Sequence, residues 1–245
     1  MSKSSPISAT QRKAIEKATG YKFRSLKLLV QALTHRSWRN ERIQRGEAED
    51  LETNERLEFL GDAVLDLAIT AELLKVFPEK PEGELSKLRA ALVQEKSLAQ
   101  VAKELGLQDY ILLGEAEDRA GGRKKPSILA DAYEALLGAI YLDSGMRRAS
   151  AVIQEHFGKR LTAPSLARRV TDHKTRLQER TQQLWKKAPH YRTATVTGPD
   201  HRRIFEVEVV INGEVIGAGQ AGSKKEAGQK AARMGLKTLK ERTAE

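Results

Sequence analysis

The sequence contains no cysteine, few aromatic residues and no long apolar run. Without cysteine the chain forms neither disulfides nor thiolate metal sites, and such a composition fits a reducing compartment. The first six residues have no apolar core of the kind found in secretory signals, and no stretch approaches the roughly 20 apolar residues that span a bilayer. We therefore expect a cytoplasmic protein that has no membrane partner.

Charge is distributed unevenly along the 245 residues, which carry a formal net charge of +10. Residues 1–145 hold 22 basic and 23 acidic residues, a net charge of −1. Residues 146–171 have a net charge of +5 and residues 172–245 a net charge of +6. A basic segment beside a near-neutral domain is typical of a protein that binds a polyanion, although a surface that only confers solubility has the same property.

One short segment concentrates acidic residues. Residues 54–62, with sequence NERLEFLGD, place Glu55, Glu58 and Asp62 at spacings of three and four residues, and so on one face of a helix. Like charges at these spacings repel each other and destabilise an isolated helix. Acidic helix faces are often simply solvated, but here a metal ion or basic side chains would relieve the repulsion.

A second acidic pair follows about 70 residues later. Residues 127–138, SILADAYEALLG, carry Asp131 and Glu134 three positions apart on another predicted helix, whose apolar residues recur at helical spacing. Each acidic helix also contains a glycine, Gly61 or Gly138, and a glycine inside a helix costs roughly 1 kcal/mol relative to alanine. The glycines favour close packing beside the acids. Two acidic helices that meet would offer the carboxylate oxygens that Mg²⁺ prefers.

The first 145 residues are predicted to be almost wholly helical. Pro78 and Pro81 end the first acidic helix near residue 76, and Asn54 is a favourable N-cap for its start. The polar stretch 39–53 is predicted to be an exposed loop, and residues 120–126 a flexible basic loop. Helices are predicted over residues 7–19, from 25, over 54–76, 82–93 and 97–105, from about 127, and over 149–161.

The pattern changes after residue 172 to helix, three strands and helix. Alternating apolar residues over 205–211 indicate a half-buried strand, and Asn212-Gly213 is a strong signal for a two-residue hairpin turn. The helices are predicted at 174–187 and 224–239, and the flanking strands at 191–197 and 214–221. The fold class is therefore a mainly α domain followed by a small α+β domain of order α-β-β-β-α.

Together these segments resemble a known family. Residues 54–62, the upstream ALTHRS at 32–37 and the downstream DAYEA at 131–135 resemble bacterial ribonuclease III. The C-terminal part resembles a double-stranded-RNA-binding domain. The resemblance implies an endonuclease domain at 7–145, a basic helical end and linker at 146–171, and an RNA-binding domain at 172–241.

The resemblance also implies an activity. It predicts a homodimer in which each protomer cuts one strand of double-stranded RNA and leaves 5′-phosphate and 3′-hydroxyl ends. The cofactor would be Mg²⁺, with Mn²⁺ as a substitute, and no small molecule would be the substrate. Processing of ribosomal, messenger and transfer RNA precursors is the expectation for the family.

Site residues carry over by position. Glu58, Asp131 and Glu134 are expected to bind metal, and Asp62 and Glu134 to be catalytic. Glu55 and Glu82 match supporting acids of the cleft. His35 is expected to be structural. The residues expected to bind RNA are Thr175, Gln178, Glu179, Gln182, His201, Ser223, Lys224 and Lys225.

Two rival hypotheses have different functions. The first is an RNA-binding relative that has lost cleavage, but such a protein has no reason to keep mutually repelling carboxylates. The second is a metal-dependent hydrolase of small phosphate esters, which would have no use for a basic RNA-binding domain. Cleavage of a labelled RNA duplex with and without Mg²⁺ distinguishes all three.

Overall fold

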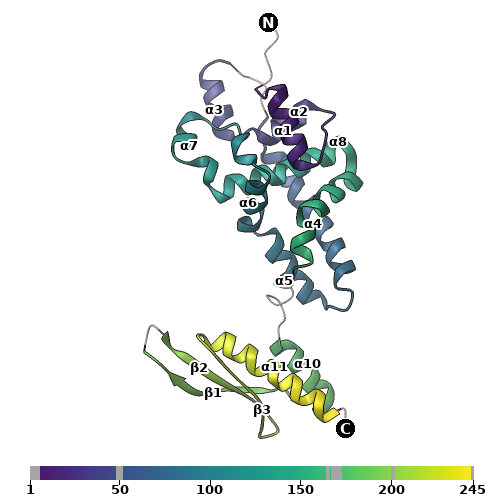
Figure 1. The fold of residues 1–245 in the computed structure, drawn as a ribbon, viewed down its shortest axis with the longest axis vertical. Helices are drawn as coiled ribbons and strands as arrows, with labels where there is room; N and C mark the ends of the chain where they lie inside the picture. The colour runs from purple at the N-terminus through teal and green to yellow at the C-terminus, as the bar shows by residue number, and fades with distance from the viewer. Residues whose placement is uncertain (1–5, 48–51, 164–165, 167–172, 200–201, 244–245) are drawn as a thin grey trace. The chain divides into compact units, whose positions relative to one another are not determined.

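The computed structural model describes residues 6–47, 52–163, 166, 173–199 and 202–243. It divides into two compact units, Met1–Val170 and Thr171–Glu245. The first is helical and the second combines two helices with a three-stranded sheet (Figure 1), which confirms the predicted fold class. Within the described residues, no helix has both the length and the apolar character needed to cross a membrane.

The helical unit is built around two long helices that pack against each other, α4 (Glu55–Val76) and α8 (Pro126–Leu161). The apolar face expected on α8 is fully buried, and Tyr133 and Leu136 at its centre have no exposed surface. The α8 helix kinks at Gly145, where φ is 77°. The other elements are α1 (Ala9–Thr19), α2 (Leu26–Leu33), α3 (Arg36–Gln44), α5 (Glu82–Val93), α6 (Glu95–Glu104), α7 (Glu115–Arg119) and the 3₁₀ turns η1 (Leu107–Asp109) and η2 (Gly122–Lys124).

The prediction of a loop over residues 39–53 is wrong for its first part, because α3 continues to Gln44. This helix buries no side chain, so it has no apolar period for sequence reasoning to detect. Ion pairs stabilise it instead, including one between Arg45 and Glu41, which are four residues apart. The segment around Arg45 is also tied to α7 by a 2.9 Å ion pair with Glu115.

Asn54 occupies the N-cap position of α4, but it does not cap the helix in the way expected. Its backbone is helical and its side chain makes no capping hydrogen bond. The residue is almost fully buried, and its backbone N–H donates to the Thr34 carbonyl at 2.9 Å. Tertiary packing therefore sets the start of this helix.

The basic segment before α8 is not a flexible loop. It forms the turn η2, and the Arg123 guanidinium fixes it to preceding parts of the chain. Arg123 Nε donates to Asp118 at 2.9 Å, and its Nη1 donates to the carbonyls of Gln108 and Ile111, both at 2.9 Å. A planar guanidinium with several donors suits this set of acceptors.

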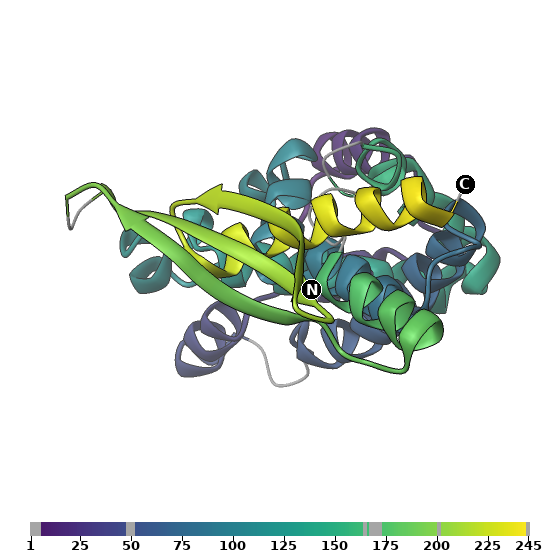
Figure 2. The same ribbon diagram turned by 90° about the horizontal axis from the view of Figure 1, so that it is seen from below.

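The second unit places α11 (Lys224–Thr243) across one face of an antiparallel sheet (Figures 1 and 2), with α10 (His173–Trp185) packed against α11. The strands β1 (His190–Thr197), β2 (Ile204–Ile211) and β3 (Glu214–Ala221) lie in sequence order, with β2 in the middle. Asn212 and Gly213 both have positive φ, as a type I′ hairpin turn requires. Apolar residues of β2 face the helices, and Val209 is fully buried.

Candidate metal centre and RNA-binding surface

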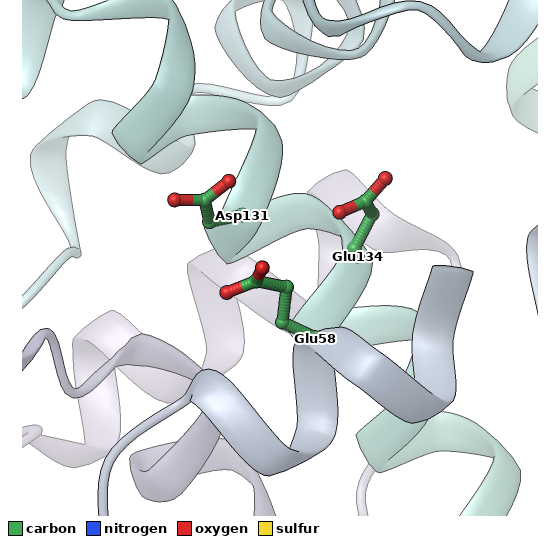
Figure 3. Close-up of side chains that lie close together, drawn as sticks. All are labelled: Glu58, Asp131 and Glu134. Atoms are coloured by element: carbon green, nitrogen blue, oxygen red, sulfur yellow. The ribbon is translucent and has the colours of Figure 1, made fainter. Parts of the chain in front are cut away.

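Three carboxylates from two helices converge in the helical unit. Glu58 on α4 and Asp131 and Glu134 on α8 each offer an oxygen, and these oxygens lie within 4.8 Å of one another. Figure 3 shows the side chains gathered where the two helices cross. All three are half-buried. Residues about 70 positions apart in the sequence thus form one acidic cluster.

Two glycines bring the helices close enough for this convergence. A Cβ added to Gly61 would lie 1.8 Å from the carbonyl oxygen of Glu134, and one added to Gly138 would lie 2.2 Å from that of Leu57. Real Cβ atoms do not approach backbone so closely, so any larger residue would push the helices apart. This confirms the close packing predicted from the glycines, and it explains how Glu58 reaches the two acids of α8.

The three carboxyls of the cluster all have pKa values raised above those of isolated carboxyls. Burial, followed by the charges of Asp62, Glu58 and Asp131, raises the pKa of Glu134 to about 8. Burial and the neighbouring Asp131 also raise the pKa of Glu58, and burial raises that of Asp131. Both causes penalise the ionised form. A cation among these oxygens would remove the penalty.

The donor set fits a hard divalent cation. It consists of carboxylate oxygens with the separation that shared ligands require, and Mg²⁺ characteristically takes one or a few carboxylates and keeps several waters. The half-buried position leaves one side open for water and substrate, as a catalytic metal site requires.

The other predicted acids are not among the three converging carboxylates, although Glu55 lines the same cavity as Glu58 and Asp131. Asp62 is exposed one turn beyond Glu58, close enough for its charge to raise the pKa of Glu134, after the larger effect of burial. Glu55 is exposed at the start of α4 and accepts a 2.9 Å hydrogen bond from the Thr53 hydroxyl. Glu82 is exposed in the first turn of α5, accepts a 2.6 Å hydrogen bond from Ser86, and is not among the three converging carboxylates.

A cavity of 420 Å³ extends from Glu58 and Asp131 toward basic residues that sequence reasoning did not select. Its other lining residues include Arg36 and Lys125, and Lys125 pairs with Glu117 at 2.6 Å. His35 also lines it, but its Nδ1 accepts from the Ser37 backbone N–H and so caps α3. Burial lowers the pKa of His35. The ALTHRS segment and the basic segment at 120–126 were the sequence signals that pointed to this wall of the cavity.

The predicted RNA-binding residues lie on exposed surfaces of the second unit. Thr175, Gln178, Glu179 and Gln182 are all exposed on α10, whose Leu177 and Thr181 are buried on the other side. At the start of α11, Lys224 and Lys225 are exposed and the Ser223 hydroxyl accepts from the Glu226 backbone N–H at 3.2 Å. His201 lies outside the described residues.

Family models match both units. Residues 25–161 match the ribonuclease-III-like model, and residues 173–239 match the double-stranded RNA binding motif. The chain belongs to the ribonuclease III family. It is therefore an endoribonuclease that acts on double-stranded RNA, in a family that uses a divalent metal.

Relatives named Ribonuclease 3 match over nearly their full length. The protein from Campylobacter jejuni is 43% identical over 225 residues, which is 92% of this chain and 96% of that protein. The protein from Desulfotalea psychrophila is 44% identical over 229 residues, 91% of each chain. That from Syntrophotalea carbinolica is 41% identical and covers 96% of this chain and 100% of its own.

Solved structures of the Campylobacter jejuni nuclease domain resemble the helical unit. One is 44% identical, covers 62% of this chain and 96% of its own, and has a TM-score of 0.55. A second is 45% identical, covers 60% of this chain and 98% of its own, and has a TM-score of 0.53. The second is described as showing structural flexibility in a region involved in dimer formation.

Proposed function

We propose that this ribonuclease III uses Mg²⁺ to cleave double-stranded RNA into products with 5′-phosphate and 3′-hydroxyl ends. Mn²⁺ would serve as a substitute. The observation that carries the proposal is the convergence of Glu58, Asp131 and Glu134 at the crossing of α4 and α8. No nucleophilic cysteine exists in the chain, and a metal-assisted attack by water needs none.

We assign different roles to the acidic residues. Glu58, Asp131 and Glu134 hold the metal, which when bound neutralises phosphoryl charge and makes a water more acidic. Asp62 lies at the exposed edge of the cluster, and we assign it to orienting the attacking water. Glu134 is assigned as both ligand and catalytic group, a role that the family resemblance implies and that its position among the converging carboxylates supports. Glu55 and Glu82 remain supporting acids of the cleft in this proposal.

RNA recognition is assigned mainly to residues 172–241, and cleavage to residues 7–145, with 146–171 as the basic connection. Duplex RNA has a wide, shallow minor groove, and proteins read its shape, 2′-hydroxyls and phosphates. The exposed polar residues of α10 suit the minor groove. Lys224 and Lys225 suit phosphates, which the N-terminus of α11 also attracts. His201 is assigned to a further groove contact.

We also propose that the enzyme is a homodimer. Phe59, Leu67 and Leu74 are 83%, 60% and 55% exposed on α4. Their spacings of eight and seven residues place them on one side of the helix, close to the acidic cluster. Exposed apolar stripes of this kind mark interaction surfaces. A second protomer that covers the stripe would lie beside the catalytic acids.

The biological substrates follow from the family rather than from the site. We propose ribosomal, messenger and transfer RNA precursors, cut in the cytoplasm. Recognition by shape permits many duplexes, so the selection of transcripts is assigned to their folded structure.

Substitution of one acid tests the proposal. Glu134→Gln keeps the size of the side chain but removes its charge, and should lower cleavage of a labelled duplex by more than about 100-fold, since even outer-sphere changes at metal sites cost about 10- to 100-fold. Binding of the duplex should persist. Glu72→Gln, on α4 but paired with Lys75 at 2.7 Å, is the matched control and should cut normally.

Two results would contradict the proposal. Equal cleavage with and without added Mg²⁺, after removal of bound metal by a chelator, would exclude the assigned cofactor. Loss of binding together with cleavage in the Glu134→Gln variant would show that this residue acts in folding or RNA binding instead.

A further inference from the structure

A separate cavity of 650 Å³ lies where the end of α1 meets the kink of α8. Its lining residues on α8 begin at Ser144, ten residues after Glu134, and continue past the kink at Gly145. Figure 1 shows α1 and α8 in the same part of the helical unit. The basic side chains that line the cavity, which we call the basic cradle, are Lys17, Lys22, Arg24, Arg147 and Arg148.

Hydrogen bonds hold the two sides of the cradle together. Asp143 on α8 accepts from the Tyr21 hydroxyl at 2.6 Å, from the backbone N–H of Arg24 at 2.8 Å and from that of Ser25 at 2.9 Å. Arg148 donates to the Gly20 carbonyl at 3.1 Å, and its guanidinium carbon lies 5.8 Å from the centroid of the Tyr21 ring. The segment that follows α1 is thus fixed against the kink before any ligand arrives.

The acids beside the cradle are largely engaged elsewhere. Glu16 accepts from Arg12 at 2.9 Å and from the Phe23 backbone N–H at 3.0 Å. Asp143 is occupied by the three donors above, and Glu155, beside Gly20, is exposed. Within the described part of the chain, no ion pair involves the remaining basic side chains, which are Lys17, Lys22, Arg24 and Arg147. Five basic side chains therefore lie beside three acids, Glu16, Asp143 and Glu155, and positive charge is in excess.

We propose that the basic cradle binds phosphate groups, and that these belong to the backbone of the duplex RNA on one side of the cut. Guanidinium groups match phosphate oxygens with paired hydrogen bonds, and clustered cations raise the local concentration of polyanions. The site is distinct from the acidic cluster and from the residues of the second unit. A free nucleotide presents the same phosphate chemistry and is the alternative source.

The salt dependence of RNA binding tests whether the phosphate groups belong to duplex RNA. The full chain, kept metal-free so that nothing is cut, is titrated with a duplex about twice the roughly 16 base pairs that one double-stranded-RNA-binding domain spans. In the variant Lys22→Glu with Arg147→Glu, the slope of log affinity against log salt should become shallower by about one for each phosphate that the cradle ceases to neutralise. The matched control reverses two exposed charges elsewhere, Lys103→Glu with Lys159→Glu.

Calorimetric titration with ADP tests whether the phosphate groups belong to a free nucleotide. If ADP binds the wild-type chain and not the cradle variant, while the RNA slope is unchanged, the ligand is a free nucleotide. If the cradle variant matches the control in both experiments, the proposal is overturned. Because no step requires cleavage, failure here leaves the assignment of the nuclease site untouched.

Folding is checked with the same proteins. The single variant Arg147→Ala removes one exposed cation without introducing repulsion and should keep the wild-type melting temperature. It should still make the salt slope of RNA binding shallower, by less than the double variant does. The proposal would be contradicted if this correctly folded variant kept the wild-type salt slope and ADP affinity and the double variant also had no effect.

Discussion

The two units build their functional surfaces in different ways. The acidic cluster of the helical unit exists only because α4 and α8 cross at backbone contact and bring together residues far apart in the sequence. The residues of α10 and α11 that we assign to RNA binding lie on exposed sides of single helices. A site made by convergence depends on packing beneath it, whereas a site on one helix depends mainly on its own side chains.

The sharpest test of this difference is Gly61→Ala. The new Cβ would meet the Glu134 carbonyl at 1.8 Å, so the helices must separate and the three carboxylates with them. We expect cleavage to fall by more than about 100-fold. We also expect a loss of about 3 kcal/mol in the free energy of unfolding, near the upper end for overpacking. Thermal melts and cleavage rates measure both.

Gly158→Ala is the matched control for that substitution. Gly158 lies in α8, and a Cβ there would meet nothing within 4 Å. Because alanine favours helix over glycine, this change should stabilise the protein by about 0.5–1 kcal/mol and leave cleavage intact. If both variants behaved alike, the helix crossing would not be what positions the acids.

A pH experiment addresses the charge of the cluster. The pKa of Glu134 rises from 4.5 to about 8 on folding without metal, so the folded state binds the proton more tightly. The free energy of unfolding of the metal-free protein should therefore fall as pH rises from about 4.5 to about 8. Mg²⁺ should raise the melting temperature more at about pH 8.5 than at about pH 6, where protons compete with it.

The Glu134→Gln variant provides the control for the pH experiment. Its stability should depend less on pH over this interval, because the carboxyl whose pKa is raised to about 8 is gone. A Mg²⁺ effect that is independent of pH in the wild-type protein would argue against metal binding at these carboxylates.

The smallest effect is expected in the second unit. Lys224→Ala removes one exposed cation at the start of α11 and should weaken RNA binding while the rate at saturating RNA is preserved. The salt slope should become shallower by about one. Lys237→Ala, on the same helix in an exposed pair with Glu241 at 3.7 Å, should change binding less. If the two substitutions weakened RNA binding equally, the start of α11 would have no special role in binding RNA.

Much of this architecture could be predicted from the sequence where local patterns agree with tertiary packing. The apolar period of α8, the prolines after Val76 and the Asn212-Gly213 turn each indicate their own structure. The spacing of the acids and the flanking glycines indicated a close contact between two acidic helices, and the family resemblance then selected the individual acids. What the sequence could not supply was the distance between Glu58 and the α8 acids, which is a tertiary quantity.

Other features escaped prediction for identifiable reasons. The helix α3 buries no side chain and is held by ion pairs, so periodicity could not reveal it. Asn54 resembled a cap by residue type, yet its burial against Thr34 decides its role. Lys125 and Arg36 line the cavity through contacts that join separate segments, which one sequence does not display.

The guanidinium of Arg123 has a consequence for motion in the catalytic unit. Arg123 lies in η2, three residues before α8 begins. Its guanidinium joins this turn to the carbonyls of Gln108 and Ile111, which are 15 and 12 residues earlier in the chain. The start of α8 therefore cannot swing outward without breaking several bonds at once. A side chain outside the acidic cluster thereby restrains the start of the helix that carries Asp131 and Glu134.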